Sequence, residues 1–217
     1  DDNKKFAYQS LLAFYLCFQV SKGDDSEWIS YIRTLPKDFT MPYFCKKTEL
    51  YHLPEHVLVK IVEQNNLIKT SFQHLFDMLN DEAKEKFSLD TFKWAYFVCN
   101  SRSVYINSNC LSPLVNQLAF KELLSDEANM ALAPMLDLLN HSDKAKTRCQ
   151  LSHAGGFIAN NVDSIKNGSV QLNYMLCAMN SWKKYEQIFI NYGTFNNTKL
   201  LLEYGFVLPN NQMDFLE

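Results

Sequence analysis

The chain has 217 residues, of which 47% are hydrophobic and 14% aromatic, and its formal net charge is −3. This apolar content is sufficient for a packed core and excludes a disordered chain. The near balance of charges excludes a general electrostatic attraction to nucleic acid or to an anionic membrane, and no run approaches the ~18 apolar residues that a membrane span needs.

Helical patterns fill the first hundred residues. Apolar side chains in 7–20 recur at spacings of three and four, which predicts a buried helix. Ser26 can then cap a short helix whose inward residues are Trp28, Ile29 and Ile32.

A longer periodic stretch follows Pro54, and the Asn65-Asn66 step is a point where this helix can bend or break. Its predicted apolar stripe consists of Val57, Leu58, Ile61, Val62, Ile68, Phe72, Leu75, Phe76 and Leu79. Ser88 can cap the next helix, which has Phe92, Ala95, Tyr96 and Cys99 on one face.

Extended segments dominate the second half. Strands are expected at 104–106, 148–152, 157–159, 170–178 and 187–192. A short helix is expected at 198–204, with Asn196 or Asn197 as its cap and Gly205 just beyond its end. Helices followed by strands predict the α+β class.

Cysteine and histidine spacing argues against a metal site. The six cysteines, at positions 17, 45, 99, 110, 149 and 177, form no CxxC pair. They are expected to be reduced thiols that pack as small apolar residues, which predicts an intracellular protein, cytoplasmic or nuclear. His52 and His56 are four apart, but Pro54 lies between them and no third ligand is placed by spacing.

Three segments near the C-terminal end carry the functional signal: Asp137-Leu138-Leu139-Asn140-His141-Ser142, Glu186-Gln187-Ile188-Phe189-Ile190-Asn191-Tyr192-Gly193, and Leu200-Leu201-Leu202-Glu203-Tyr204-Gly205-Phe206-Val207. Each is weak alone, because a single histidine or tyrosine beside apolar residues is usually structural. Their order and spacing carry more information than any one of them.

In that order and spacing the segments resemble SET-domain protein methyltransferases, in the group that includes the plant Rubisco large-subunit methyltransferase. Phe92-Lys93-Trp94-Ala95 and Ser101-Arg102-Ser103 resemble the end of the helical insert of that group. The resemblance implies a helical SET insert over about 1–103 and the C-terminal half of the SET domain over 104–217. It also implies a knot-like threading, in which the segment near Tyr204 passes under the loop that carries Asn140.

The implied activity is that of a protein-lysine N-methyltransferase that uses S-adenosyl-L-methionine and acts on a histone or another protein. Tyr192 matches the catalytic tyrosine and also contacts the cofactor. The other residues that match the family's site are Arg102, Asn140 and His141 for the cofactor, and Tyr204 and Asp137 for the substrate. The expected partner is therefore a protein that presents a target lysine.

The sequence also departs from this family. It starts at Asp1-Asp2 and contains no Gly-x-Gly turn of the kind that cradles the cofactor, so we expect a part of a larger enzyme that binds S-adenosyl-L-methionine weakly by itself. Tyr185 stands where the family usually has glycine, which can alter the turn before Tyr192. Two alternatives remain open: a non-catalytic SET-like module that binds partner proteins, and a protein-histidine methyltransferase.

Overall fold

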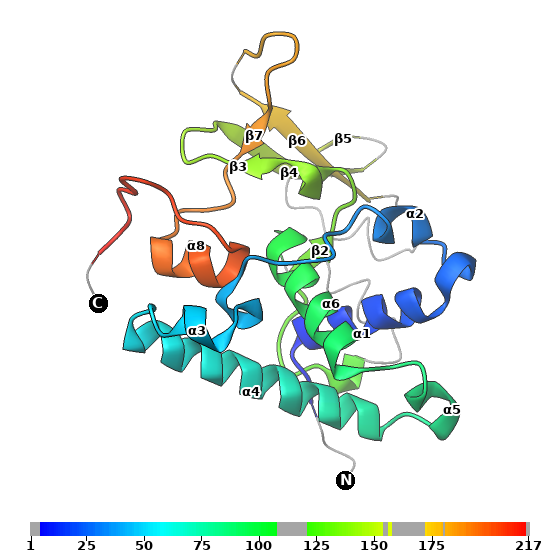
Figure 1. The fold of residues 1–217 in the computed structure, drawn as a ribbon. Helices are drawn as coiled ribbons and strands as arrows, with labels where there is room; N and C mark the ends of the chain where they lie inside the picture. The colour runs from blue at the N-terminus through cyan, green and yellow to red at the C-terminus, as the bar shows by residue number, and fades with distance from the viewer. Residues whose placement is uncertain (1–4, 108–120, 154–155, 158–171, 180, 216–217) are drawn as a thin grey trace. The chain divides into compact units, whose positions relative to one another are not determined.

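The computed structural model describes residues 5–107, 121–153, 156–157, 172–179 and 181–215 (Figure 1). The chain divides into two compact units, one formed by 1–101 with 195–217 and the other by 102–194. Helices precede strands along the chain, which confirms the α+β class. Over the described ranges, no helix is long and apolar enough to cross a membrane. The boundary near residue 103 and the knot-like threading stay predictions.

The first unit is helical. Its described elements are α1 (Tyr8–Ser21), η1 (Gly23–Asp25), α2 (Ile29–Ile32), η2 (Pro42–Phe44), α3 (Lys47–Leu50), α4 (Glu55–Asp77), α5 (Asp81–Lys84), α6 (Leu89–Arg102) and α8 (Asn197–Tyr204). Figure 1 shows α4 as the long helix along which α1 and α6 lie.

Aromatic packing joins these three helices. Phe92 of α6 is fully buried, and its ring centroid lies 5.5 Å from that of Phe72 in α4 and 6.4 Å from that of Phe14 in α1. Offset and edge-to-face ring pairs of this kind add to the stability gained by burying apolar surface. The predicted helix over 7–20 and the predicted face of α6 are confirmed. The side chains expected to bury α1 are partly wrong, because Tyr15 and Phe18 are 46% and 47% exposed and the helix instead buries the face with Ala13, Leu16 and Cys17.

Two expectations for α4 are wrong. The helix runs without a break through Asn65-Asn66, because burial of the apolar stripe on both sides outweighs the low helix propensity of asparagine. The side chain of Asn65 turns back onto the helix and donates to the carbonyl of Ile61 (3.0 Å). Val62 is 57% exposed although the pattern assigned it to the stripe. It directly follows the buried Ile61, so it turns away from the packed side of the helix.

The turn before α2 is built differently from a simple cap. Ser26 is buried; its hydroxyl donates to Oε1 of Gln19 (2.8 Å) and accepts from the N–H of Trp28 (3.1 Å). The helix itself begins at Ile29, and its buried residue is Tyr31, which the sequence pattern did not single out. Ser26 therefore fixes the turn to α1 rather than capping α2.

The second unit contains the strands. β1 (Ser103–Tyr105) pairs antiparallel with β2 (Met130–Leu132), and β4 (Thr147–His153) lies between β5 (Gly156–Phe157) and β6 (Leu172–Ala178), both antiparallel to it. β3 (Asn140–His141) pairs parallel with β7 (Phe189–Ile190). The 3-10 turns are η3 (Lys121–Leu123) and η4 (Leu136–Leu138). The strands expected at 148–152 and 170–178 thus pair with each other, while residues 158–159 and 170–171 of the expected strands lie outside the described residues.

Buried thiols behave as the sequence predicts. Cys17 and Cys99 are free and almost inaccessible to solvent. Burial raises the pKa of the Cys17 thiol to about 12, and it also raises the pKa of Cys99. Such thiols are protonated and unreactive at neutral pH, so they serve as small core residues.

Candidate functional site

A parallel strand pair brings together two segments that are 49 residues apart in the sequence. β3 and β7 align Asn140 with Phe189 and His141 with Ile190, and the N–H of Ser142 extends the ladder to the carbonyl of Ile190 (2.9 Å). Ile190 is buried, so burial of its side chain helps to hold the pair in place. Since Tyr192 follows β7 by two residues, this register returns it to the Asn140-His141 segment.

Tyr192 makes two hydrogen bonds to that segment. Its hydroxyl donates to the carbonyl of Leu139 at 2.7 Å, and its backbone N–H donates to Nδ1 of His141 at 3.1 Å. The two rings lie 5.1 Å apart between centroids. Burial raises the pKa of Tyr192; Arg102 opposes this shift and Asp137 adds to it. The hydroxyl therefore stays protonated at neutral pH.

His141 is held as a neutral ring. Because its Nδ1 accepts the N–H of Tyr192, the ring proton of the neutral form is assigned to Nε2. Burial lowers the pKa of His141, while the carboxylate of Asp143 acts in the opposite direction. Nε2–H is thus a hydrogen-bond donor, and the neighbouring Asn140 is exposed and offers an amide donor and acceptor.

Arg102 and Asp137 form an ion pair. Nη1 of Arg102 donates both to Oδ2 of Asp137 (3.2 Å) and to its backbone carbonyl (3.0 Å). The side chain of Asp137 is inaccessible to solvent and that of Arg102 is 22% exposed. A buried carboxylate is stable only when it is paired in this way, so each residue needs the other.

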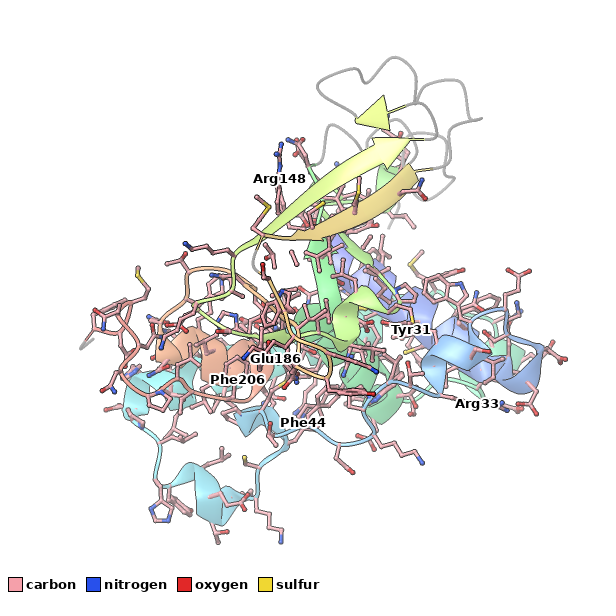
Figure 2. The ribbon with its side chains drawn as sticks, turned by 90° about the horizontal axis from the view of Figure 1, so that it is seen from above. Tyr31, Arg33, Phe44, Arg148, Glu186 and Phe206 are labelled. Atoms are coloured by element: carbon pink, nitrogen blue, oxygen red, sulfur yellow. The ribbon has the colours of Figure 1, made fainter. Side chains whose placement is uncertain are left out.

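Two exposed residues near these segments have left-handed backbone geometry. Met135 (φ 76°) directly precedes η4. Tyr185 (φ 73°) lies in a turn in which the N–H of Lys183 donates to Oε2 of Glu186 at 2.8 Å (Glu186 is labelled in Figure 2). A positive φ favours glycine, which is the residue that the family resemblance implies at position 185. The turn is therefore formed with tyrosine at a cost in backbone strain.

Tyr204 belongs to the other compact unit. It is the last residue of α8, and its ring centroid lies 6.1 Å from that of Phe195 and 6.2 Å from that of Phe206. Nζ of Lys199 lies 4.2 Å above the Phe195 ring. This aromatic row, Phe195, Tyr204 and Phe206, already holds one alkylammonium group by a cation–π contact.

The end of α8 follows the predicted pattern. The side chain of Asn196 accepts from the N–H of Lys199, and Gly205 takes a left-handed conformation (φ 80°) with its N–H on the carbonyls of Leu200 and Leu201. The predicted cap and helix-ending glycine are confirmed. This geometry fixes the position of Tyr204 within its unit.

Five of the six predicted site residues thus lie in one unit: Arg102, Asp137, Asn140, His141 and Tyr192. Sequence reasoning missed the Leu139 carbonyl, which holds the Tyr192 hydroxyl, because a main-chain acceptor leaves no sequence signal. It also missed that Asp137 is the partner of Arg102 and that Phe195 and Phe206 flank Tyr204. No rule of sequence spacing pairs an arginine with an aspartate that lies 35 residues further along the chain.

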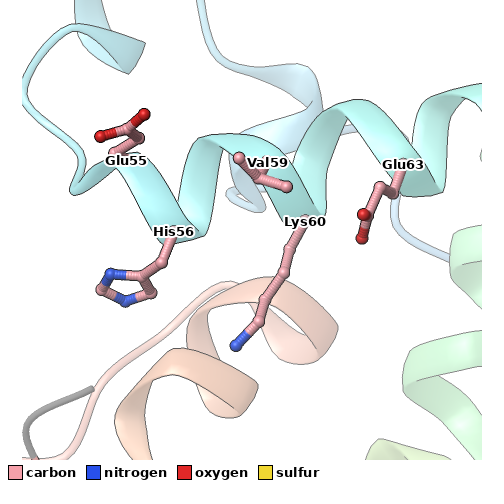
Figure 3. A pocket seen from close by; sticks show the side chains of 5 residues that line it. All are labelled: Glu55, His56, Val59, Lys60 and Glu63. Atoms are coloured by element: carbon pink, nitrogen blue, oxygen red, sulfur yellow. The ribbon is translucent and has the colours of Figure 1, made fainter.

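A groove on α4 is separate from these residues. It has a volume of about 600 Å³ and is lined by Glu55, His56, Val59, Lys60 and Glu63 (Figure 3). All five come from a single helix, and their charges are mixed. None of the predicted site residues lines this groove.

Comparisons with known proteins agree on one family, although no family model matches the chain. The chain is 28% identical over 216 residues to SET domain-containing protein 4 of Artemia parthenogenetica, covering 99% of this chain and 48% of that protein. It is 30% identical over 204 residues to ribosomal lysine N-methyltransferase set10 of Schizosaccharomyces pombe, covering 94% of this chain and 32% of that protein.

Among solved structures, the SET domain of LSMT bound to lysine and AdoHcy superimposes with a TM-score of 0.68 at 22% identity, over 93% of this chain and 41% of that one. The chain spans less than half the length of the relatives it matches. Relatives in sequence and neighbours in fold thus coincide: over nearly its whole length the chain is similar to SET domain-containing protein 4, and it has the fold of the SET domain of LSMT.

Proposed function

We propose that the protein containing this chain is a protein-lysine N-methyltransferase that uses S-adenosyl-L-methionine. The observation that carries the proposal is the β3–β7 pair, which gathers the exposed Asn140, the neutral His141 and the fixed hydroxyl of Tyr192. LSMT, the fold neighbour, is bound to lysine and AdoHcy, and set10 is named a ribosomal lysine methyltransferase.

The donor set of this segment fits the polar parts of S-adenosyl-L-methionine. Asn140 offers an amide that both donates and accepts, and Nε2–H of His141 donates. When bound, the cofactor supplies an electrophilic methyl group. Asn140 and His141 would hold the cofactor through these uncharged hydrogen-bonding groups.

The amine of the substrate must be neutral to react. A free lysine has a pKa of about 10.4, so its deprotonation at pH 7 costs about 4–5 kcal/mol. A half-buried site disfavours the ammonium form and reduces this cost. The site would present this neutral amine to the methyl group of the cofactor, and the extra proton of the methylated ammonium product would be released to solvent.

Tyr192 would orient the amine. Because its O–H is donated to Leu139, the hydroxyl would meet the amine as an acceptor of one of its N–H groups. The raised pKa of Tyr192 keeps the hydroxyl neutral, so the residue acts by alignment and not as an anionic base.

Tyr204 would line the channel for the lysine side chain. Its aromatic row attracts an alkylammonium group, as the position of Lys199 over Phe195 illustrates. Such contacts are worth about 0.5–2 kcal/mol, depending on desolvation. The same row is a poor match for an imidazole, which needs hydrogen-bond partners, and this favours lysine over histidine as the target.

The partner that follows from this function is a protein with an accessible lysine. An intracellular site of action, cytoplasmic or nuclear, agrees with the free thiols of Cys17, Cys45, Cys99 and Cys177.

The test uses the full-length protein, methyl-labelled S-adenosyl-L-methionine and arrays of lysine-containing peptides, with parallel arrays in which lysine is replaced by histidine or arginine. We expect label only where lysine is present. Tyr192→Phe should lower kcat by about 10²-fold because alignment of the amine is lost, with an unchanged circular dichroism spectrum. Tyr185→Phe, a change at a 91% exposed tyrosine of the same unit, is the matched control.

Label on the histidine arrays would favour a histidine methyltransferase. Binding of S-adenosyl-L-methionine without transfer to any array would favour the non-catalytic module. Turnover by Tyr192→Phe at the wild-type rate would remove Tyr192 from catalysis.

A further inference from the structure

Two connections in the strand-containing unit carry a cluster of positive charge. They are residues 142–148, which lead from β3 into β4, and residues 181–188, which lead from β6 into β7. Together they hold five cationic and two acidic side chains, although the net charge of the whole chain is −3. All five cations are exposed to solvent, and we call them the basic patch: Lys144, Lys146, Arg148, Lys183 and Lys184.

Hydrogen bonds hold the two connections together at both ends. At one end, the start of β4 pairs with the end of β6, and the N–H of Met179 donates to the carbonyl of Lys146 (2.9 Å). At the other end, the N–H of Ser142 donates to the carbonyl of Ile190 (2.9 Å). Both connections therefore run between the β4–β6 pair and the β3–β7 pair, and Figure 1 shows them at the same end of β4 and β6.

Exposure alternates along the first connection, so that its cations share one side. Lys144, Lys146 and Arg148 are exposed, whereas the residues between them are half-buried (Arg148 is labelled in Figure 2). Successive side chains of an extended chain point to opposite sides, which gives residues two apart the same direction. In the second connection, Lys184 lies against the exposed ring of Tyr185 (4.7 Å from Nζ to the ring centroid), a contact that leaves its charge in place.

The charge of the basic patch is not neutralised within the unit. In the part of the chain that the structure describes, none of its five side chains forms an ion pair. The two acidic residues of the connections are engaged locally: Oε2 of Glu186 accepts the N–H of Lys183 (2.8 Å), and the carboxylate of Asp143 acts on the ring of His141, where it opposes the effect of burial on the pKa. The basic patch thus presents positive charge to solvent.

This distribution of charge fits a short acidic segment of a protein better than a nucleic acid. Nucleic-acid binding is typical of domains that are basic as a whole. A run of phosphates would extend beyond the basic patch onto a chain that carries net negative charge, which disfavours it. A few carboxylates, in contrast, can be matched by five cations, and salt screens them from charges more than about 8–10 Å away.

The basic patch adjoins the candidate site. The first connection begins directly after His141, and the second leads through β7 to Tyr192. Ser142 and Ile190 are hydrogen-bonded to each other, so both connections start or end within a few residues of the Tyr192 hydroxyl. An extended peptide advances about 3.3 Å per residue, so residues close to a lysine that meets Tyr192 come within reach of these cations.

We propose that the basic patch binds acidic residues that flank the target lysine in the protein substrate. The proposal rests on the proposed function and names a substrate class for it, a lysine within an acidic sequence. Electrostatic attraction of this kind speeds association and selects the partner, without taking part in the methyl transfer itself.

Binding is measured without methyl transfer, by fluorescence anisotropy with the full-length protein. Two labelled peptides each have one central lysine, flanked on both sides by glutamates in one peptide and by glutamines in the other. At low ionic strength the glutamate peptide should bind about tenfold more tightly, and the difference should shrink as salt is added, because salt screens exposed charges. Equal affinities at low ionic strength would overturn the proposal.

Charge reversal in either connection tests whether the basic patch is responsible. Lys183→Glu/Lys184→Glu should lower the affinity for the glutamate peptide by about tenfold, and Lys144→Glu/Lys146→Glu should lower it to a similar extent, because both pairs belong to one patch. The affinity for the glutamine peptide should change by less than about twofold in both variants. The second variant also provides the test if the first does not fold. An undiminished preference for glutamate in a folded variant would refute the proposal.

The matched control is Lys37→Glu/Lys47→Glu, which makes the same change of charge at two exposed lysines of the other compact unit. It should keep the wild-type affinity, and an equal loss would mean that net charge, rather than the basic patch, governs binding. A labelled double-stranded oligonucleotide probes the alternative partner. If the oligonucleotide binds through the basic patch while the two peptides are not distinguished, the patch belongs to a nucleic-acid site and the proposal fails.

Methyl transfer to the same peptides separates this proposal from the proposed function. In the wild-type protein, kcat/KM should favour the glutamate peptide mainly through KM, with kcat within about twofold, because the basic patch does not touch the reacting amine. Equal transfer to both peptides would refute a role of the patch and leave the methyltransferase function standing. Patch-dependent binding of the glutamate peptide, with no transfer to any lysine peptide, would support the acidic partner and remove the methyltransferase function.

Discussion

Replacement of Gly205 by alanine tests how the end of α8 holds Tyr204. Gly205 has φ 80°, and its carbonyl accepts the hydroxyl of Thr40 at 2.9 Å. A Cβ at this position would clash with Oγ1 of Thr40 and would lie 3.0 Å from the backbone nitrogen of Met41. The first contact can be relieved by rotating a side chain, but the second requires main chain to move.

Three terms set the magnitude. Alanine in the left-handed region costs about 1–2 kcal/mol, of which roughly 0.4–1 kcal/mol is offset by the lower entropy of the unfolded alanine chain. Displacing the Thr40 hydroxyl removes a hydrogen bond worth about 1 kcal/mol. Crowding against Met41 adds roughly 1 kcal/mol more. Gly205→Ala should therefore lower the free energy of unfolding by about 3 kcal/mol.

The measurement is chemical or thermal unfolding of the full-length protein, with Tm reduced by roughly 2–4 °C for each kcal/mol. Gly23→Ala is the matched control, since Gly23 also has a positive φ (56°) but no atom lies within 4 Å of its added Cβ. It isolates the backbone term, about 1 kcal/mol. Equal losses in the two variants would refute the steric reasoning, and Thr40→Ala added to Gly205→Ala should recover only part of the loss because the Met41 contact persists.

Three further predictions concern individual side chains. The lowered pKa of His141 makes the neutral ring stabilising: this contribution is complete above the ordinary histidine pKa of about 6.5 and is lost as the pH falls through the pKa of the folded protein. The free energy of unfolding, measured between pH 7 and pH 5, should therefore decline less in His141→Gln than in wild type. Asn197→Ala removes side-chain hydrogen bonds to the N–H and the carbonyl of Leu208 and to the carboxylate of Asp214. The free energy of unfolding should fall by about 2–3 kcal/mol and limited proteolysis within 205–214 should become faster, so unchanged cleavage would contradict this role. Tyr185→Asn should raise the free energy of unfolding by about 0.5–1 kcal/mol because asparagine tolerates a positive φ, whereas Tyr185→Val should lower it. If thermal unfolding ranks the valine variant as more stable than the asparagine variant, backbone strain at this turn is excluded.

Local patterns account for the helices that the sequence predicts well. The burial of Phe92, Ala95, Tyr96 and Cys99 follows from periodicity, and the cap at Asn196 follows from residue type. The prediction failed at Asn65-Asn66, where propensity suggested a break. There the weak preference of two asparagines, a few tenths of a kcal/mol each, is smaller than the gain from burying Ile61 and Ile68 on either side.

The candidate site depends on contacts that no local pattern encodes. The alternating pattern predicted a strand at 187–192, but only Phe189–Ile190 form β7, and no strand was predicted at Asn140–His141. The parallel pairing of Asn140 with Phe189 is set by the fold, because a strand of two residues carries no pattern that specifies its register. Family resemblance named the side chains of Asn140, His141 and Tyr192, but not that Tyr192 hydrogen-bonds to both neighbours of Asn140. Arg102 illustrates the same limit, since its partner lies 35 residues away.

The shortness of β3 and β7 has a consequence for how site variants should be interpreted. A ladder of two residue pairs gives little stability by itself, so the segment also depends on the bonds that Tyr192 makes to Leu139 and His141 and on the pair between Arg102 and Asp137. Tyr192→Phe removes one of these bonds while it removes the hydroxyl that would orient the amine. Its effect on kcat therefore combines a looser turn with lost alignment of the amine, and the fall in the free energy of unfolding of the same variant reports the first of these.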